Sequence, residues 1–99
     1  MDKFHTSSDF LRRARAAARR TGYDPAKLEL SDDGEHKLVY NSPDGVKRFG
    51  RRGYGDFIYY SLFEPAIADI KRKSYRARAG AIRDSGKFSP NQLALRILW

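Results

Sequence analysis

Two Asp-Gly pairs, Asp33-Gly34 and Asp44-Gly45, constrain the fold of this chain more than any other feature. They separate three short segments, 27–31, 36–41 and 46–49, in which apolar and polar residues tend to alternate. Asp-Gly supplies the positive φ angles that tight hairpin turns require, and alternation is typical of a strand with one buried face. The sequence therefore predicts a three-stranded antiparallel meander whose apolar face must be covered by other elements.

A helix within residues 1–22 is predicted to provide part of this cover. Thr6 or Ser7 is suited to cap its beginning, and Gly22 follows its last turn. At 100° per residue, its apolar face is formed by Phe10, Leu11, Ala14, Ala17 and Ala18. Its opposite face is basic and is formed by Arg12, Arg15 and Arg19, with Arg13 and Arg20 beside them.

Further helices are predicted after the meander. Glu64-Pro65 begins one that continues to Gly80, because proline is favoured in the first turn, and Ser89-Pro90 begins a short last helix by the same logic. The last helix supplies docking residues, namely Leu93, Ile97, Leu98 and Trp99. We expect this docking segment to close the domain's own core, with insertion into a neighbouring subunit as the alternative.

These elements predict one small α+β domain covering 1–99. It comprises a basic helix in 1–22, an acidic meander in 23–50, and a basic, aromatic part with two or three helices in 51–99. Ninety-nine residues, 40% of them hydrophobic, suffice for one core. The absence of cysteine excludes disulfides and thiolate metal sites. Apolar runs are far shorter than the roughly 18 residues of a membrane span, so we expect a soluble, intracellular or packaged protein.

Charge is strongly positive and unevenly spread. Residues 1–22 carry six basic against two acidic side chains, 23–45 carry two against six, and 46–99 carry twelve against four. A net charge of +8 indicates a polyanion or an acidic protein surface as partner, and binding rather than catalysis. The residues expected to contact the partner or its phosphates are Arg12, Arg13, Arg15, Arg19, Arg20, Arg51, Arg52, Lys71, Arg72, Lys73, Arg76 and Arg78.

No catalytic or metal-binding motif is found in the sequence. His5 is expected in a frayed terminus and His36 in a hairpin, both at the surface and without further ligands at metal spacing. Glycines 50, 53 and 55 lack the Lys-Ser or Lys-Thr of a phosphate-binding loop. We therefore expect no enzymatic activity, no metal and no cofactor.

The remaining candidates have a structural interpretation beside the functional one. Asp56 and Asp69 are interpreted as partners of Arg72 or Arg76. Aromatic residues interleaved with basic ones resemble a platform for stacking nucleobases, although a small core needs the same rings. They are Tyr54, Phe57, Tyr59, Tyr60, Phe63 and Tyr75.

A series of landmarks follows a fixed order through 46–99. They are Val46, Phe49-Gly50, Gly53-Tyr54, Asp56-Phe57, Arg72, Tyr75, Arg78, Phe88-Ser89-Pro90-Asn91, Leu93-Ala94 and Leu98-Trp99. The series resembles a family of small basic proteins of large nucleocytoplasmic DNA viruses, the giant viruses. That family usually has histidine where this chain has Ala79, so no role of that histidine carries over. The resemblance implies a viral setting and no enzymatic activity.

Two functions follow from the resemblance and the charge. The first is a virion structural protein, a minor capsid or cement component that binds acidic surfaces of other capsid proteins through its arginine-rich helices. The second is a sequence-independent DNA- or RNA-binding protein associated with the viral genome. The shell is favoured, because an acidic middle third is of little use to a protein that condenses nucleic acid. The expected location is the virion, and the host cytoplasm or nucleus during assembly.

Overall fold

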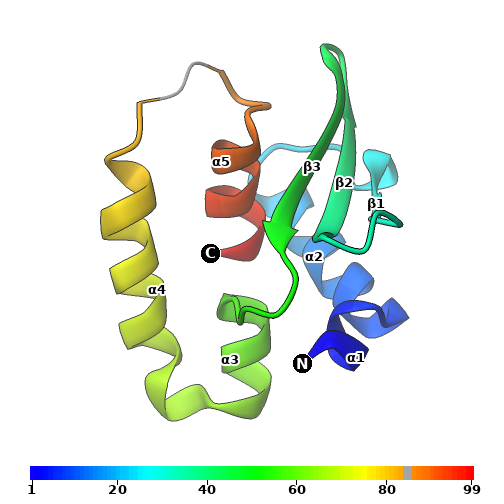
Figure 1. Cartoon of the computed structure of the whole chain (residues 1–99). Helices are drawn as coiled ribbons and strands as arrows, with labels where there is room; N and C mark the ends of the chain where they lie inside the picture. Colours follow the sequence, from blue (N-terminus) through cyan, green and yellow to red (C-terminus); the bar gives the residue numbers. More distant parts are fainter. Residues whose placement is uncertain (84–85) are drawn as a thin grey trace.

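The computed structural model describes residues 1–83 and 86–99, which form a three-stranded sheet with helices packed around it (Figure 1). The helices are α1 (Asp2–His5), α2 (Ser8–Arg20), α3 (Phe57–Phe63), α4 (Pro65–Gly80) and α5 (Pro90–Leu93). The strands are β1 (Leu28–Leu30), β2 (His36–Ser42) and β3 (Gly45–Arg51). A 3₁₀ turn, η1 (Pro25–Lys27), precedes β1, and a π-helical turn, η2 (Ala94–Leu98), continues α5. The predicted α+β architecture is confirmed.

The sheet is the predicted antiparallel meander in the order β1-β2-β3. Leu28 pairs with Tyr40, and Leu38 pairs with Phe49, so the apolar residues of the three strands are in register. Both turn glycines have positive φ, 78° at Gly34 and 121° at Gly45, as the Asp-Gly pairs predict. The strand boundaries differ from the predicted ones by one or two residues only.

The predicted helix caps are present. Ser7 Oγ accepts a hydrogen bond from the Phe10 N–H at 3.2 Å, and α2 begins at the next residue. Ser89 Oγ accepts from the Gln92 N–H at 3.1 Å at the beginning of α5. Helix α3 was not predicted as a separate element, although Asp56 caps it by accepting from the Tyr59 N–H at 2.8 Å.

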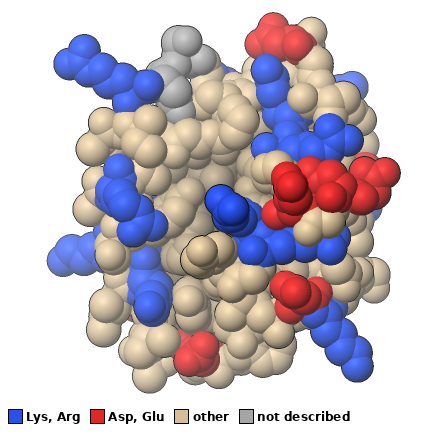
Figure 2. All heavy atoms as spheres, in the orientation of Figure 1, with Lys and Arg blue, Asp and Glu red and all other residues tan. Residues whose placement is uncertain are grey.

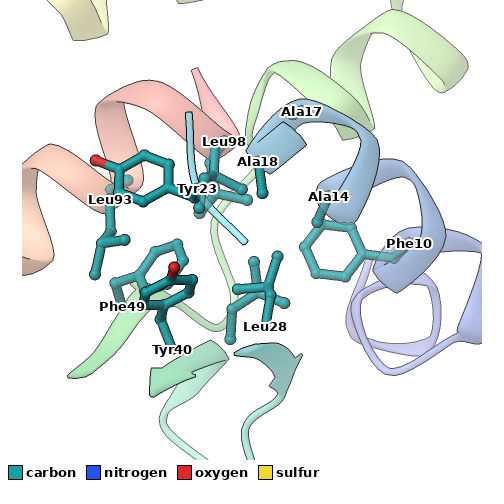
Figure 3. Packing of buried hydrophobic residues seen from close by; sticks show 13 residues of the cluster. Phe10, Ala14, Ala17, Ala18, Tyr23, Leu28, Tyr40, Phe49, Leu93 and Leu98 are labelled. Carbon is teal, nitrogen blue, oxygen red and sulfur yellow. The ribbon is translucent and has the colours of Figure 1, made fainter. Parts of the chain in front are cut away.

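The hydrophobic core lies where α2, the sheet and the C-terminal helical segment meet (Figure 3). Three alanines of α2, Ala14, Ala17 and Ala18, are small enough to let this helix approach the other two elements closely, and they are buried as predicted. The docking residues Leu93, Ile97 and Leu98 are buried in the domain's own core, and Trp99 is half-buried at its edge. Gly50 permits this packing, because a Cβ there would lie 2.7 Å from Leu98 Cδ1.

A buried ionic cluster corrects two predictions about the N-terminus and Asp56. His5 is fully buried in α1 and is not in a frayed terminus. Its Nε2 lies 2.9 Å from Asp56 Oδ2, and its ring packs against that of Phe10 with the two ring centroids 4.7 Å apart. Lys37 Nζ donates to the same carboxylate oxygen at 3.0 Å. Asp56 therefore pairs with Lys37 and His5 rather than with an arginine of α4.

The charges of this cluster depend on one another. Burial alone would raise the pKa of Asp56, but the close contact with His5 Nε2 and the charge of Lys37 outweigh it and hold that pKa below its usual value. Burial lowers the pKa of Lys37, and the nearby carboxylate opposes this. The ionised Asp56 thus joins α1, β2 and the beginning of α3.

Replacing Asp56 with asparagine should destabilise the fold strongly. Asparagine can still cap α3, so Asp56→Asn removes the charge while keeping the cap. The substitution leaves Lys37 buried without its counterion, which should cost about 3 kcal/mol or more in the free energy of unfolding. Chemical denaturation measures this, with Asp69→Asn on exposed α4 as a control that should change stability by about 0.5 kcal/mol or less. Equal stability of the two variants would contradict the role of the cluster.

The same carboxylate should make stability fall in acid. Because the pKa of Asp56 is lowered in the folded chain, the unfolded chain takes up this proton first as the pH drops below about 4. Stability should therefore be constant above about pH 5 and decline below it, with a shallower decline in Asp56→Asn. Other carboxylates with lowered pKa values, Asp9 and Asp33, contribute alike to both proteins. Denaturation midpoints from pH 7 to 2 measure the difference, and parallel curves would refute it.

Candidate functional site

A cleft of about 460 Å³ lies between α4 and the end of β3. One wall is a single face of α4, since its residues follow the spacing i, i+3, i+4 and i+7: Lys71, Ser74, Tyr75 and Arg78. The other wall is formed by Lys37, Gly50, Arg51, Tyr54 and Gly55. The floor is formed by Ala94, Leu98 and Trp99, and Tyr60 of α3 also lines the cleft.

Helix α4 stands away from the core and forms this wall. Only Ala68 and Ala79 of α4 are buried, and Figure 1 shows the helix apart from the sheet, with the C-terminal segment between them. Arg72 Nε and Arg76 Nη2 each donate to the main-chain oxygen of Trp99 at 2.7 Å. These two arginines were predicted to contact a partner, but here they tie α4 to the floor of the cleft.

Arg72 also contacts an aromatic ring. Its guanidinium carbon lies 4.2 Å from the ring centroid of Phe57, which is cation–π distance. Burial, together with the nearby charge of Arg76, lowers the pKa of Arg72. Arg72 is therefore chiefly a structural residue that positions the wall.

Three cations in the cleft face no carboxylate. Within residues 1–83 and 86–99, no acidic oxygen lies within 4.0 Å of Arg51, Lys71 or Arg78. Figure 2 shows blue side chains on both sides of a recess near the middle of this face, whereas red side chains gather on the right. The cleft therefore carries positive charge that is not neutralised by the described part of the chain.

Three acidic side chains of the middle segment are engaged in ion pairs outside the cleft lining. Glu29 pairs with Arg15 at 2.8 Å, and Asp33 pairs with His36 at 2.6 Å. Arg48 of β3 lies within 3.8 Å of Asp32 and 3.7 Å of Asp33. Several acids of the middle segment thus hold the sheet and α2 together.

Aromatic rings line the same cleft. Tyr75 and Trp99 stack with centroids 4.4 Å apart and planes 10° from parallel. The Arg78 guanidinium lies 5.5 Å from the ring of Tyr75, and burial raises the pKa of that tyrosine, so its hydroxyl stays protonated at neutral pH. Tyr54 is 65% exposed at the opposite wall. Cationic and aromatic side chains therefore line the same cleft.

The predicted aromatic platform is divided by the fold. Tyr54, Tyr60 and Tyr75 line the cleft. Tyr59 and Phe63 instead pack around Phe4 of α1, with centroids 6.2 and 5.2 Å from its ring. For Tyr59, Tyr60 and Phe63, the side of α3 on which the ring lies decides whether it packs against α1 or lines the cleft. The sequence shows no regular helix pattern in this region, so it did not reveal α3.

The basic face of α2 is a separate surface. Arg12 and Arg13 pair with Asp9, and Arg15 donates to the Leu28 carbonyl at 2.9 Å as well as to Glu29. The three arginines predicted to form one face, 12, 15 and 19, are therefore not equivalent. Arg19 and Arg20 are exposed, and neither has a carboxylate within 4.0 Å among the residues described.

Two further predicted contact residues lie outside the cleft lining. Arg52 donates to the carbonyls of His36 and Ser31 at 3.2 and 3.1 Å, so it braces the sheet. Lys73 is exposed, but it lies two residues from Lys71 and therefore on the side of α4 that faces away from the cleft. The residues that the structure brings together around one opening are thus Arg51, Lys71 and Arg78.

Comparison with protein-family models, curated proteins and solved structures found no match to this chain. The resemblance to proteins of large DNA viruses therefore stays a prediction. None of the helices in the described part of the chain is both long and apolar enough to cross a bilayer.

Three side chains that can bind metal ions lie close together: the ligand atoms of Asp33, Glu35 and His36 are all within 4.8 Å of one another. The hydrogen bonds of a turn explain this proximity, since one oxygen of Asp33 accepts from the Glu35 and His36 N–H groups at 3.0 and 2.9 Å.

We expect EDTA to leave the melting temperature unchanged, because protein groups already hold this carboxylate. Differential scanning calorimetry with and without EDTA measures this, and a fall of several degrees would show that the fold needs a metal.

Proposed function

We propose that this protein binds nucleic acid through its phosphates, without reading sequence and without catalysing a reaction. The observation that carries the proposal is the convergence of Arg51, Lys71 and Arg78 on one cleft, where no carboxylate of residues 1–83 and 86–99 lies within 4.0 Å of them. Arginine and lysine bind phosphate oxygens with charge-assisted hydrogen bonds, and each such contact releases counterions from the nucleic acid.

The geometry of α4 favours an extended anion over a single small one. Lys71 and Arg78 are two helical turns apart, about 10 Å along the axis. A chain of phosphates can engage these cations in succession, whereas one isolated anion would reach only some of them.

The acidic middle segment does not argue against this function. Its presence favoured a shell protein on sequence alone, because free carboxylates would repel phosphates. In the fold, Glu29 and Asp33 pair with Arg15 and His36, and none of these four residues lines the cleft. Their charge stabilises the sheet and leaves the α4 side positive.

The viral resemblance leads us to propose a location as well. A phosphate-binding cleft would associate the chain with the genome inside the virion rather than with the shell. In the infected host it would act where genome and particle are assembled, in cytoplasm or nucleus.

A second candidate is binding of an acidic capsid protein, the shell function. It is favoured by a shallow groove on α2, where Arg12, Arg19 and Arg20 surround the apolar side chains of Leu11 and Pro25. Such a surface fits an acidic segment that also carries apolar residues. Two of these arginines, 19 and 20, have no acidic partner among the described residues.

Salt dependence tests the proposal. For probes of unrelated sequence, log Kd should rise linearly with log salt, with a slope of about 0.9 per phosphate contacted for a DNA duplex and about 0.7 for a single RNA strand. The triple variant Arg51→Gln, Lys71→Gln, Arg78→Gln should lose two to three contacts, and the slope should decrease accordingly. Fluorescence anisotropy from low to physiological salt measures both quantities.

The matched control changes the same net charge on α2, with Arg12, Arg19 and Arg20 replaced by glutamine. This control should retain most of the affinity for nucleic acid. Equal losses in the two triple variants would show that only net charge matters and would refute a phosphate site in the cleft. Binding of polyglutamate, lost in the α2 variant alone, would favour the shell function.

A further inference from the structure

We infer that the cleft accepts an unpaired nucleobase, so that the protein prefers a single strand over a duplex. This inference rests on the proposed function and adds the class of nucleic acid. It follows from the juxtaposition of Tyr54, Tyr75 and Trp99 with the cations of the same cleft.

The size of the cleft suits one nucleotide. Its volume of about 460 Å³ lies in the range of pockets that enclose small molecules. The opening lies between one helix and one strand end, and its floor is apolar and aromatic at Leu98 and Trp99. A base turned out of a strand can enter such a pocket, whereas the stacked bases of a duplex stay inside the helix.

The rings are placed as a stacking surface. Tyr75 of the α4 wall and Trp99 of the floor stack nearly parallel on each other and form an aromatic layer two rings deep in the lining of the cleft. The hydrogen bonds from Arg72 and Arg76 to the Trp99 main chain fix this layer, so little conformational entropy is lost on binding. A base that stacks in this cleft gains contact without regard to its identity, which agrees with a protein that reads no sequence.

Tyr54 is the residue of the cleft that the fold itself does not explain. It is 65% exposed, and among the described residues no aromatic ring is in contact with it. It follows Gly53, whose φ of 89° turns the chain sharply after β3. An exposed ring beside Arg51 at the rim of an aromatic cleft is positioned to cover a bound base from the solvent side.

The cations lie where the flanking phosphates would pass. Lys71 and Arg78 lie at either end of the α4 face, with Tyr75 between them, and Arg51 lies on the opposite wall. Phosphates of a strand whose base occupies the cleft can contact these groups. The single-strand mode of recognition combines a basic groove with stacked bases in this way.

The test uses three probes with the full chain. They are an oligothymidylate of about 12 nucleotides, an abasic strand with the same number of phosphates, and a duplex of the same length. Trp99 is the single tryptophan of the chain, so its fluorescence reports contact with a base directly. We expect the oligothymidylate to quench Trp99 and to bind several-fold more tightly than the abasic strand and the duplex.

A pair of variants isolates the ring of Tyr54. Tyr54→Ala should weaken oligothymidylate binding by about 5- to 100-fold, the loss of one stacked base, and leave abasic-strand binding unchanged. Tyr54→Phe keeps the ring and should bind like the original protein. Position 54 is exposed, so circular dichroism should show an unchanged fold for both variants.

The two proposals fail in different ways. If all three probes bind equally and Trp99 is not quenched, the nucleobase site is refuted while phosphate binding stands. If Tyr54→Ala binds oligothymidylate as tightly as Tyr54→Phe, the ring plays no part and the inference is overturned. If none of the probes binds at low salt, the proposed function itself fails, and the nucleobase site with it.

Discussion

The buried carboxylate of Asp56 is the contact on which the arrangement of the helices depends. It receives Lys37 from β2 and His5 from α1, and it caps α3 through the Tyr59 N–H. A carboxylate cannot stay buried and ionised alone, so the elements that supply its partners must assemble together. Because α3 leads directly through Glu64 into α4, the position of the cleft wall follows from this cluster.

The second organising feature is the separation of paired from unpaired charge. The ion pairs of the described chain lie in α1, α2, the sheet and the beginning of α3, with Arg15–Glu29 and Arg48–Asp32 as examples. In helix α4, Arg72 and Arg76 instead donate hydrogen bonds to the main-chain oxygen of Trp99, and Lys71 and Arg78 line the cleft. A chain of net charge +8 thereby concentrates its available charge beside aromatic rings. This concentration, and not the total charge, is what makes the cleft a binding site for nucleic acid in our proposal.

The structure also redefines which predicted residues can act as a set. The arginines of α2 satisfied a helical pattern, yet Arg15 is engaged with β1 and Arg12 with Asp9. The residues of the cleft come from β2, β3, the following loop, α3, α4 and the C-terminal segment, several of which are far apart in sequence. A helical pattern identifies the α4 face, because Lys71, Tyr75 and Arg78 share it. It cannot reveal Arg51, Tyr54 or Trp99 as their neighbours.

The sequence by itself determined the local structure. The Asp-Gly pairs specified the meander, Ser7 and Ser89 specified helix beginnings, and the alanines of α2 specified its buried face, because turn chemistry, capping and periodicity act between near neighbours. Only the tertiary structure decided that His5 and Lys37 are buried, since a charged or polar side chain becomes favourable in a core when a partner from elsewhere meets it. The same holds for the cleft, whose charges and rings converge only after α4 has been positioned by contacts between residues more than twenty positions apart.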